Sequence, residues 1–223
     1  MALEFKEFPK IPRLKRNVIV TEKIDGTNAS VTVALFNPTV EADTNRVAMV
    51  THEGFNYDIF AGSRNRFITP GNDNFGFATW VLKNANDLVK LGVGTHYGEW
   101  WGSGIQRGYG LPKGEKRFSL FNVSRWADRH LYPHPTAYLT DQEILADPLP
   151  DGTRWAPLCC HVVPELSFGP QDFAVDAALN ELRLHGSHAA PFLNPEGIIV
   201  YHTAARQYFK VTLEKDEEPK GKS

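Results

Sequence analysis

Short runs of alternating apolar and polar residues recur along the chain and are separated by turn residues. The runs are rich in Val, Ile, Phe, Tyr and Thr, a composition and spacing typical of β-strands that bury one face. The pattern predicts strands at residues 17–22, 29–36, 46–51, 95–101, 118–123, 197–202 and 207–213.

Two longer segments carry apolar residues at helical spacing instead. In residues 74–92 the apolar positions are Ala78, Val81, Leu82, Ala85, Leu88 and Val89, and Gly92 offers a stop. In residues 171–186 they are Val175, Ala178, Leu179 and Leu182, with Gly186 as the expected end. Strands grouped around separated helices predict an α+β fold, in which antiparallel sheets are joined by hairpins and flanked by helices.

The chain has 223 residues, of which 42% are hydrophobic and 12% aromatic, which is ample for a packed core. This length fits one large domain or two small ones. Because the sequence contains no internal repeat and no Ser/Gly linker, we expect a single domain over residues 1–223. The composition excludes the disordered and fibrous classes of protein.

The sequence contains no run of about 18 apolar residues and begins without the long apolar segment of a secretory signal. We therefore expect an intracellular, cytoplasmic protein that has no membrane partner. The proline-rich stretch 130–157 predicts surface loops or a small excursion from the core. The charged, apolar-poor residues 214–223 predict a frayed tail.

The cysteines and histidines show no metal-binding pattern in the sequence. Cys159 and Cys160 are adjacent, which suits neither a structural disulfide nor a zinc site and fits a reducing compartment. His52, His96 and His161 lie at no ligand spacing, and we interpret them as ordinary residues.

The formal net charge is −2, so any contact with nucleic acid has to come from a local basic face. Three stretches offer such a face, although each taken singly is typical of solvated surface. They are Lys6, Lys10, Arg13, Lys15 and Arg16 near the N-terminus, Arg64 and Arg66 in one loop, and Lys113, Lys116 and Arg117 in another.

The stretch EKIDGTN, residues 22–28, has two interpretations. Asp25-Gly26 between two apolar alternations is a strong hairpin signal, and Lys23 would then be an exposed flanking residue. Alternatively, Lys23 is a nucleophile held at a strand end near carboxylates and phosphate-binding groups. An unperturbed lysine has a pKa of about 10.4, so a nucleophilic lysine needs a neighbouring cation or partial desolvation to become neutral. Lys210 and a bound metal ion are the candidate cations.

Further stretches favour the nucleophile. Six motifs occur in order between Glu22 and Glu214: EKIDGTN, GSRNR, YGEWWGSGIQ, RFSLFNV, PEGIIV and FKVTLE. Their order and their sequences resemble those of the ATP-dependent RNA ligases of the covalent nucleotidyltransferase superfamily, of the type of the second RNA ligase of phage T4. The resemblance covers nearly the whole chain and implies an RNA-repair enzyme of the phage type, with a nucleotidyltransferase domain and no OB domain.

The resemblance implies roles for particular residues. Lys23 and Lys210 would be catalytic, with AMP carried covalently on Lys23. Nucleotide binding would involve Glu22, Asn28, Arg64, Glu99, Phe121, Glu196 and Lys210, and the metal, Mg²⁺ or Mn²⁺, would be held by Glu196 and Asp25. Glu99 would hold the ribose, Phe121 would stack on adenine, and Asn28 and Arg64 would serve the joining of ends.

The implied reaction is the ATP-dependent joining of 5′-phosphate and 3′-hydroxyl ends of nucleic acid, with RNA in a nicked duplex as the expected substrate. Lysine–AMP and AMP-polynucleotide would be the intermediates. A DNA ligase, a capping-type guanylyltransferase and a non-catalytic nucleotide-binding or nucleic-acid-binding module are the alternatives.

The sequence also departs from the family. The closing motif pairs Lys210 with Thr212 where relatives carry two lysines, which favours the non-catalytic alternative or leaves one phosphate contact to Lys215. Relatives carry a further C-terminal domain beyond this motif, and we expect a bare nucleotidyltransferase domain here.

Several aromatic residues could be either core or ligand contacts. Phe121 lies in a β run, where phenylalanine is usually core. Tyr97, Trp100, Trp101 and Tyr109 could stack on bases, with packing the expected role of two of them.

Overall fold

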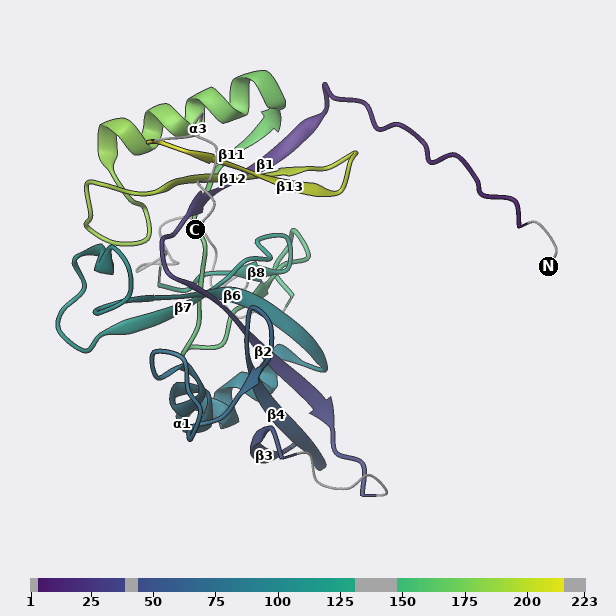
Figure 1. Cartoon of the computed structure of the whole chain (residues 1–223), viewed down its shortest axis with the longest axis vertical. Coiled ribbons are helices and arrows are strands. Elements are labelled where there is room, and N and C mark those ends of the chain that lie inside the picture. Colours follow the sequence, from purple (N-terminus) through teal and green to yellow (C-terminus); the bar gives the residue numbers. More distant parts are fainter. Residues whose placement is uncertain (1–3, 39–43, 131–147, 215–223) are drawn as a thin grey trace.

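The computed structural model describes residues 4–38, 44–130 and 148–214. These residues form two large β-sheets that lie one above the other, each with a helix on its outer side (Figure 1), and a third sheet of two short strands. The α+β fold predicted from the sequence is confirmed, and the described residues form no separate OB barrel.

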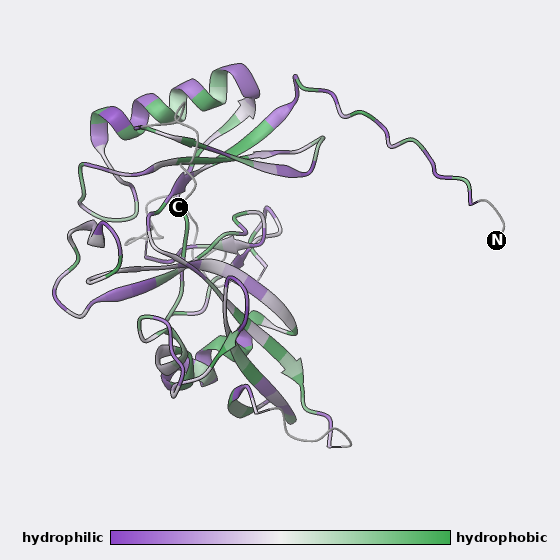
Figure 2. Ribbon diagram, in the orientation of Figure 1, coloured by the Kyte–Doolittle hydropathy of each residue, from purple (hydrophilic) through white to green (hydrophobic). Residues whose placement is uncertain are grey.

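The smaller sheet has four strands in the order β11 (Glu165–Pro170), β1 (Asn17–Lys23), β12 (Gly197–His202) and β13 (Gln207–Thr212), all antiparallel. Helix α3 (Gln171–His185) covers one face of it. Val18 and Val20 of β1 are fully buried against apolar residues of this helix, among them Ala178 and Leu182. Figure 2 shows hydrophobic and hydrophilic residues alternating along α3, as expected of a helix with one buried face.

The larger sheet has seven strands. Its order is β10 (His161–Val162), β7 (Lys116–Leu120), β6 (Gly94–Gly102), β2 (Thr27–Leu35), β4 (Phe55–Ser63) and β3 (Arg46–His52), and β5 (Phe67–Ile68) pairs with β4. Helix α1 (Phe77–Leu88), followed by the 3₁₀ turn η1 (Val89–Leu91), packs on the face formed by Ala29, Val31 and Val33. Beside this sheet, β8 (Trp126–Ala127) pairs in parallel with β9 (Arg154–Trp155), and η2 (Gly108–Gly110) follows β6.

Both predicted helices are confirmed, and the seven predicted strands all occur with small shifts at their ends. Two longer strands, β4 and β11, were missed. Strand β4 joins β3 through a tight turn in which Glu53 and Gly54 both have positive φ, the geometry of a hairpin. Within the stretch 130–157, residues 131–147 lie outside the described residues, as do residues 215–223 of the expected frayed tail.

A third apolar cluster joins the two sheets. Its buried members are Ile24, Trp101, Tyr109, Val163 and Ala190, and they come from the crossing after β1, from β6, from η2 and from the ends of β10 and α3. Because these residues are fully or almost fully buried, the cluster fixes the two sheets relative to each other next to Lys23.

Residues 4–16 form an exposed N-terminal segment whose part before Leu14 runs away from the body of the protein (Figure 1), whereas Leu14 and Lys15 contact the body at His202 and Asp172. The N-terminal basic residues predicted as a possible nucleic-acid surface lie on this segment. None of the helices among the described residues has the length and apolar character that a membrane span requires.

Candidate active site

The stretch EKIDGTN passes from one sheet to the other. Strand β1 ends at Lys23 in the smaller sheet, and β2 begins at Thr27 in the larger sheet, so the two strands do not pair. The hairpin interpretation of this stretch is therefore wrong. Gly26 is required in the crossing, because a Cβ there would lie 2.6 Å from the Trp100 carbonyl oxygen and 2.7 Å from Trp101 Cβ.

The Lys23 side chain forms an ion pair with Glu196. Strands β1 and β12 are neighbours, with Lys23 opposite Gly197, so Glu196 directly before β12 lies beside the end of β1. The Nζ of Lys23 donates a hydrogen bond to Oε2 of Glu196, and both side chains are about one-fifth exposed. Lysine and carboxylate are thus brought together from opposite ends of the sequence.

Glu99 lies next to this pair on the larger sheet. It occupies β6 directly opposite Asn28 of β2, and both side chains point away from α1, because their neighbours Ala29 and Trp100 face that helix. Oε1 of Glu99 accepts a hydrogen bond from the backbone N–H of Gly26 at 3.2 Å. The close approach that glycine allows is therefore what brings the crossing to Glu99.

The surroundings of Glu99 favour its neutral form. Burial raises the pKa of Glu99 from 4.5 to about 7, and the nearby carboxylates of Glu196 and Asp25 act in the same direction. The Lys23 ammonium and the Gly26 N–H oppose this shift. A lysine and three carboxylates thus share one neighbourhood, and one of the carboxylates is poised to titrate near neutral pH.

Arg107 and Tyr109 hold the crossing in place, and the sequence interpretation had not assigned this role to either. Arg107 Nε lies 3.2 Å from Asp25 Oδ2, and its Nη1 donates to the Asn194 carbonyl at 3.0 Å. The Asp25 N–H donates to the Tyr109 hydroxyl at 3.1 Å, and that hydroxyl donates to the Lys23 carbonyl at 3.3 Å. Both residues follow the glutamate motif directly, which is the only signal the sequence offers.

Lys210 lies on the same face of the smaller sheet as Lys23. It is opposite Ile199, and both point away from the face that α3 covers, because their neighbours Val200 and Val211 pack on that side. Two strand spacings and two residue steps separate the Cα atoms of Lys23 and Lys210, which is roughly 12 Å. Lys210 is exposed, so its long side chain can reach a phosphate group placed between the two.

Glu22 points to the opposite face of the sheet from Lys23. Its Oε2 accepts hydrogen bonds from the N–H groups of His188, at 2.8 Å, and Ala189, at 3.2 Å. Burial raises the pKa of Glu22, although the Ser187 hydroxyl and both N–H groups act against the shift. The side chain thus anchors the loop after α3, and the structure does not bring it together with the other predicted site residues.

Arg64 and Phe121 lie at the edges of the Lys23 neighbourhood. Arg64 is exposed and directly follows β4, whose last residue, Ser63, pairs with Ala29 next to Asn28. Phe121 directly follows β7, and its N–H donates to the Tyr97 carbonyl at 3.0 Å. Phe121 is half-buried against the cluster that joins the sheets, so part of its ring packs in the core and part is accessible to a ligand.

The aromatic residues proposed to stack on bases are mostly core. Trp100, Trp101 and Tyr109 are 2%, 1% and 0% exposed, so the expectation that only two of the four would pack is corrected to three. Tyr97 is 58% exposed and remains available for a ligand.

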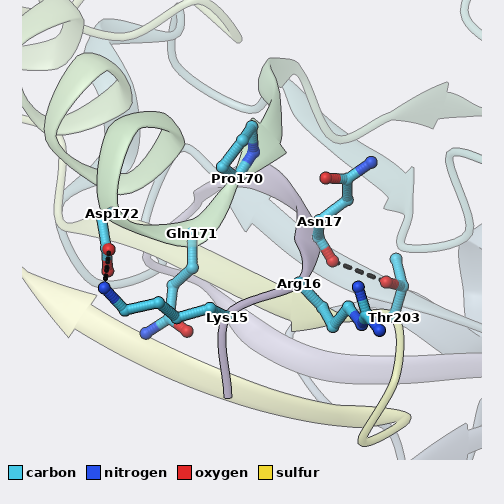
Figure 3. Close-up of a pocket in the computed structure, with 7 residues that line it drawn as sticks. All are labelled: Lys15, Arg16, Asn17, Pro170, Gln171, Asp172 and Thr203. Carbon is cyan, nitrogen blue, oxygen red and sulfur yellow. Dashed lines mark hydrogen bonds and ion pairs between the residues drawn. The ribbon is translucent and has the colours of Figure 1, made fainter. Parts of the chain in front are cut away.

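A separate pocket of about 340 Å³ opens at the start of α3 (Figure 3). Its lining includes Lys15 and Arg16, and Lys15 forms an ion pair with Asp172 at 3.4 Å. Since the pocket lies at the first residue of β1 and Lys23 at the last, about 20 Å separates them along the strand. This pocket is therefore not part of the Lys23 neighbourhood.

These features are those of a nucleotidyltransferase domain, and comparison with known proteins identifies the family. The RNA ligase family model matches residues 16–212, so the chain belongs to the RNA ligase family. The resemblance drawn from the sequence motifs is thereby confirmed. No curated protein matches the sequence.

Solved structures with a similar fold include RNA ligase mutants of Naegleria gruberi. One without ligand has a TM-score of 0.48 and 19% identity, over 88% of this chain and 49% of that chain. Another, with ATP and Mn, has a TM-score of 0.47 and 17% identity, over 91% of this chain and 52% of that chain. The chain thus spans about half the length of these structures.

Proposed function

We propose that this protein is an ATP-dependent polynucleotide ligase that joins 5′-phosphate and 3′-hydroxyl ends, with RNA in a nicked duplex as its substrate. Residues 1–223 would act as one adenylyltransferase domain. The observation that carries the proposal is the contact between Lys23 and Glu196, with Glu99 beside them at the junction of two sheets. A lysine held at a rigid strand end, beside carboxylates that can bind a cation, suits covalent transfer of a nucleotide.

In the first step, the neutral amine of Lys23 attacks the α-phosphorus of ATP. An N–P bond forms, the P–O bond to the β-phosphate breaks, and pyrophosphate leaves. Lys210, on the same sheet face, would stabilise the negative charge that develops on the phosphate oxygens. Glu99 would accept hydrogen bonds from the ribose, and Phe121 would offer its ring to adenine.

The same carboxylates fit a hard divalent cation such as Mg²⁺ or Mn²⁺. Glu196 and Asp25 offer oxygen ligands, and their negative charges, which add to the effect of burial on the pKa of Glu99, are what a bound cation would offset. A cation held by Glu196 and Asp25 would supply positive charge that stabilises the negative charge developing in the reaction.

In the second step, an oxygen of the polynucleotide 5′-phosphate attacks the lysine-bound phosphorus, and the Lys23 nitrogen leaves. In the third, a 3′-hydroxyl attacks the activated 5′-phosphorus and AMP leaves. Asn28 and Arg64, at neighbouring strand ends beside Glu99, would bind the 5′-phosphate, with the Arg64 guanidinium as a two-pronged donor. The exposed basic residues near the N-terminus would contact the nucleic-acid backbone.

The test is covalent labelling. The full chain is incubated with Mg²⁺ and α-labelled ATP or GTP, denatured, and assayed for label that stays on the protein. We expect label from ATP in the wild type and none in Lys23→Ala. Lys83→Ala is the matched control, because Lys83 is an exposed lysine on α1, and it should label like the wild type.

Other outcomes would support other functions. Label from GTP alone would indicate a capping-type enzyme, and absence of label would favour a non-catalytic binding module. Label that persists in Lys23→Ala would overturn the assignment of the nucleophile. Nicked duplexes with a ribose or a deoxyribose at the 3′ end then distinguish an RNA ligase from a DNA ligase.

A further inference from the structure

A cluster of potential metal ligands lies at the edge of the larger sheet. Asp128 follows β8, His130 comes two residues later, and His161 begins the edge strand β10. One ligand atom from each side chain can be chosen so that all lie within 4.8 Å of one another. His161, which shows no ligand spacing in the sequence, is thus brought to a carboxylate and a second imidazole by the fold.

The distances suit shared coordination better than direct hydrogen bonding. Nδ1 of His161 lies 3.5 Å from Oδ2 of Asp128, which is long for a hydrogen bond. Two ligands bound to one Zn²⁺ at about 2.0–2.1 Å in tetrahedral geometry lie roughly 3.4 Å apart. The rings of His130 and His161 are 4.2 Å apart between centroids, and one ligand atom of each lies within 4.8 Å of the other.

The groups around the cluster hold its donors in a ligating form. Asp128 is 4% exposed, and its two oxygens accept the N–H groups of His130, at 2.7 Å, and Val162, at 2.8 Å. Nε2 of His130 lies 3.0 Å from the Leu158 carbonyl oxygen. Because a carbonyl oxygen only accepts hydrogen bonds, Nε2 of the neutral ring donates to it, and Nδ1 is left as the nitrogen with a free lone pair. Metal-ligating histidines typically donate their other ring N–H to a carbonyl or carboxylate in this way. Asp128 also lines a cavity of about 360 Å³, together with Asp151 and Val162.

We propose that Asp128, His130 and His161 form a binding site for one divalent transition-metal ion, with Zn²⁺ as the expected occupant and water completing its coordination. Two imidazoles and one carboxylate select a borderline metal over Mg²⁺, which prefers oxygen ligands alone. The site is therefore chemically distinct from the carboxylates around Lys23. It would tie the end of β8 to the edge strand β10 and stabilise the fold by closing the segment between them.

The test uses the full, tag-free chain freed of metal by a chelator. Titration with Co²⁺ should produce the visible absorption of a four- or five-coordinate ion, and Zn²⁺ should displace it at one equivalent. Zn²⁺ should also raise the melting temperature of the wild type. In His130→Ala, a change at an exposed position, we expect affinity to fall at least about tenfold and the thermal stabilisation to disappear.

Two further variants make the outcome decisive. His130→Cys supplies another zinc ligand and should retain binding. His185→Ala removes an exposed histidine that is 4.0 Å from Glu181 in a different part of the chain, and it should bind like the wild type. Unchanged metal binding in His130→Ala, or no Co²⁺ absorption in the wild type, would overturn the site and leave Asp128 as a purely structural hydrogen-bond acceptor. Neither result depends on ligase activity.

Discussion

Lys23 and Glu196 are 173 residues apart in the chain, yet their side chains form an ion pair at the junction of the two sheets. The contact follows from the register of β1 and β12, which places Lys23 opposite Gly197. That register is tight, because a Cβ on Gly197 would lie 2.2 Å from the Val211 carbonyl oxygen on the next strand. Glu196 is therefore held beside Lys23 by backbone packing on both sides.

Replacing Glu196 by glutamine should slow the formation of lysine–AMP. The change removes a candidate metal ligand and the charge that positions Lys23, and loss of one such group typically costs about 100-fold or more in rate. Single-turnover transfer of labelled AMP to the protein measures this. Glu7→Gln, at an exposed position of the N-terminal segment, serves as the control, and a rate within twofold of the control would contradict the role of Glu196.

The raised pKa of Glu99 predicts how stability depends on pH. Its pKa is about 7 in the folded protein against 4.5 ordinarily, so between these values the folded state binds more protons than the unfolded state. The stability linked to Glu99 is fully present below pH 4.5 and is lost as the pH rises to about 7, by up to about 3 kcal/mol.

The variant Glu99→Gln isolates this contribution from the other titrating groups. Its free energy of unfolding minus that of the wild type should increase between pH 5 and pH 7 and level off above about pH 7. Urea denaturation at several pH values measures the difference. The same difference for Glu53→Gln, at an exposed position, should stay flat, and a flat difference for Glu99→Gln would show that burial does not shift this carboxyl.

Gly26→Ala should destabilise the protein. The added methyl group would lie 2.6 Å from the Trp100 carbonyl oxygen and 2.7 Å from Trp101 Cβ, and both atoms belong to a packed strand. Overpacking of this kind costs about 1–3 kcal/mol. Gly71→Ala is the matched control, because a Cβ at Gly71 meets nothing within 4 Å. Equal denaturation midpoints for the two variants would show that the crossing can move away from β6.

Local sequence patterns account for most strands and both helices, because apolar periodicity reports which face of an element is buried. Strand β4 was missed although Asn56 and Asp58 alternate with apolar residues, because Asn and Asp are depleted in strands, and Asp58 is compensated by an ion pair with Arg46 on β3 that only the sheet provides. Strand β11 was missed because it is an edge strand that contains Gly169 and ends at Pro170.

The sequence motifs predicted which residues belong to the candidate site but not how those residues are arranged in space. Asp25-Gly26 is a hairpin signal locally, and nothing within that stretch tells that Lys23 and Thr27 belong to different sheets. Adjacent residues of a strand point to opposite faces, so Glu22 and Lys23 are separated once β1 is known to be a strand paired with β11 and β12. The hydrogen bonds of Tyr109 depend on tertiary packing, which no local pattern records.

Tyr109→Phe should destabilise the crossing without changing its shape. The hydroxyl accepts the Asp25 N–H and donates to the Lys23 carbonyl, so its removal leaves backbone groups in a mostly buried place without their partner. Such a loss costs about 1–3 kcal/mol. The free energy of unfolding from urea titration measures it, with Tyr97→Phe, at a 58% exposed position, as the control. A change no larger than that of the control would show that water replaces the hydroxyl.

Arg64→Ala should impair the joining of ends more than the formation of lysine–AMP. Arg64 is exposed at the end of β4, whereas Lys23 and Glu196 lie across the junction on the other sheet, so the first step does not need its charge. A guanidinium that binds the 5′-phosphate typically contributes about 1.5–3 kcal/mol, or at least about a tenfold loss of sealing when removed. Labelled lysine–AMP and sealing of a nicked duplex are measured on the same preparation.

Arg206→Ala, at an exposed turn residue between β12 and β13, is the control for general loss of positive charge. Equal loss in both steps, or no loss of sealing, would remove Arg64 from the binding of the 5′-phosphate.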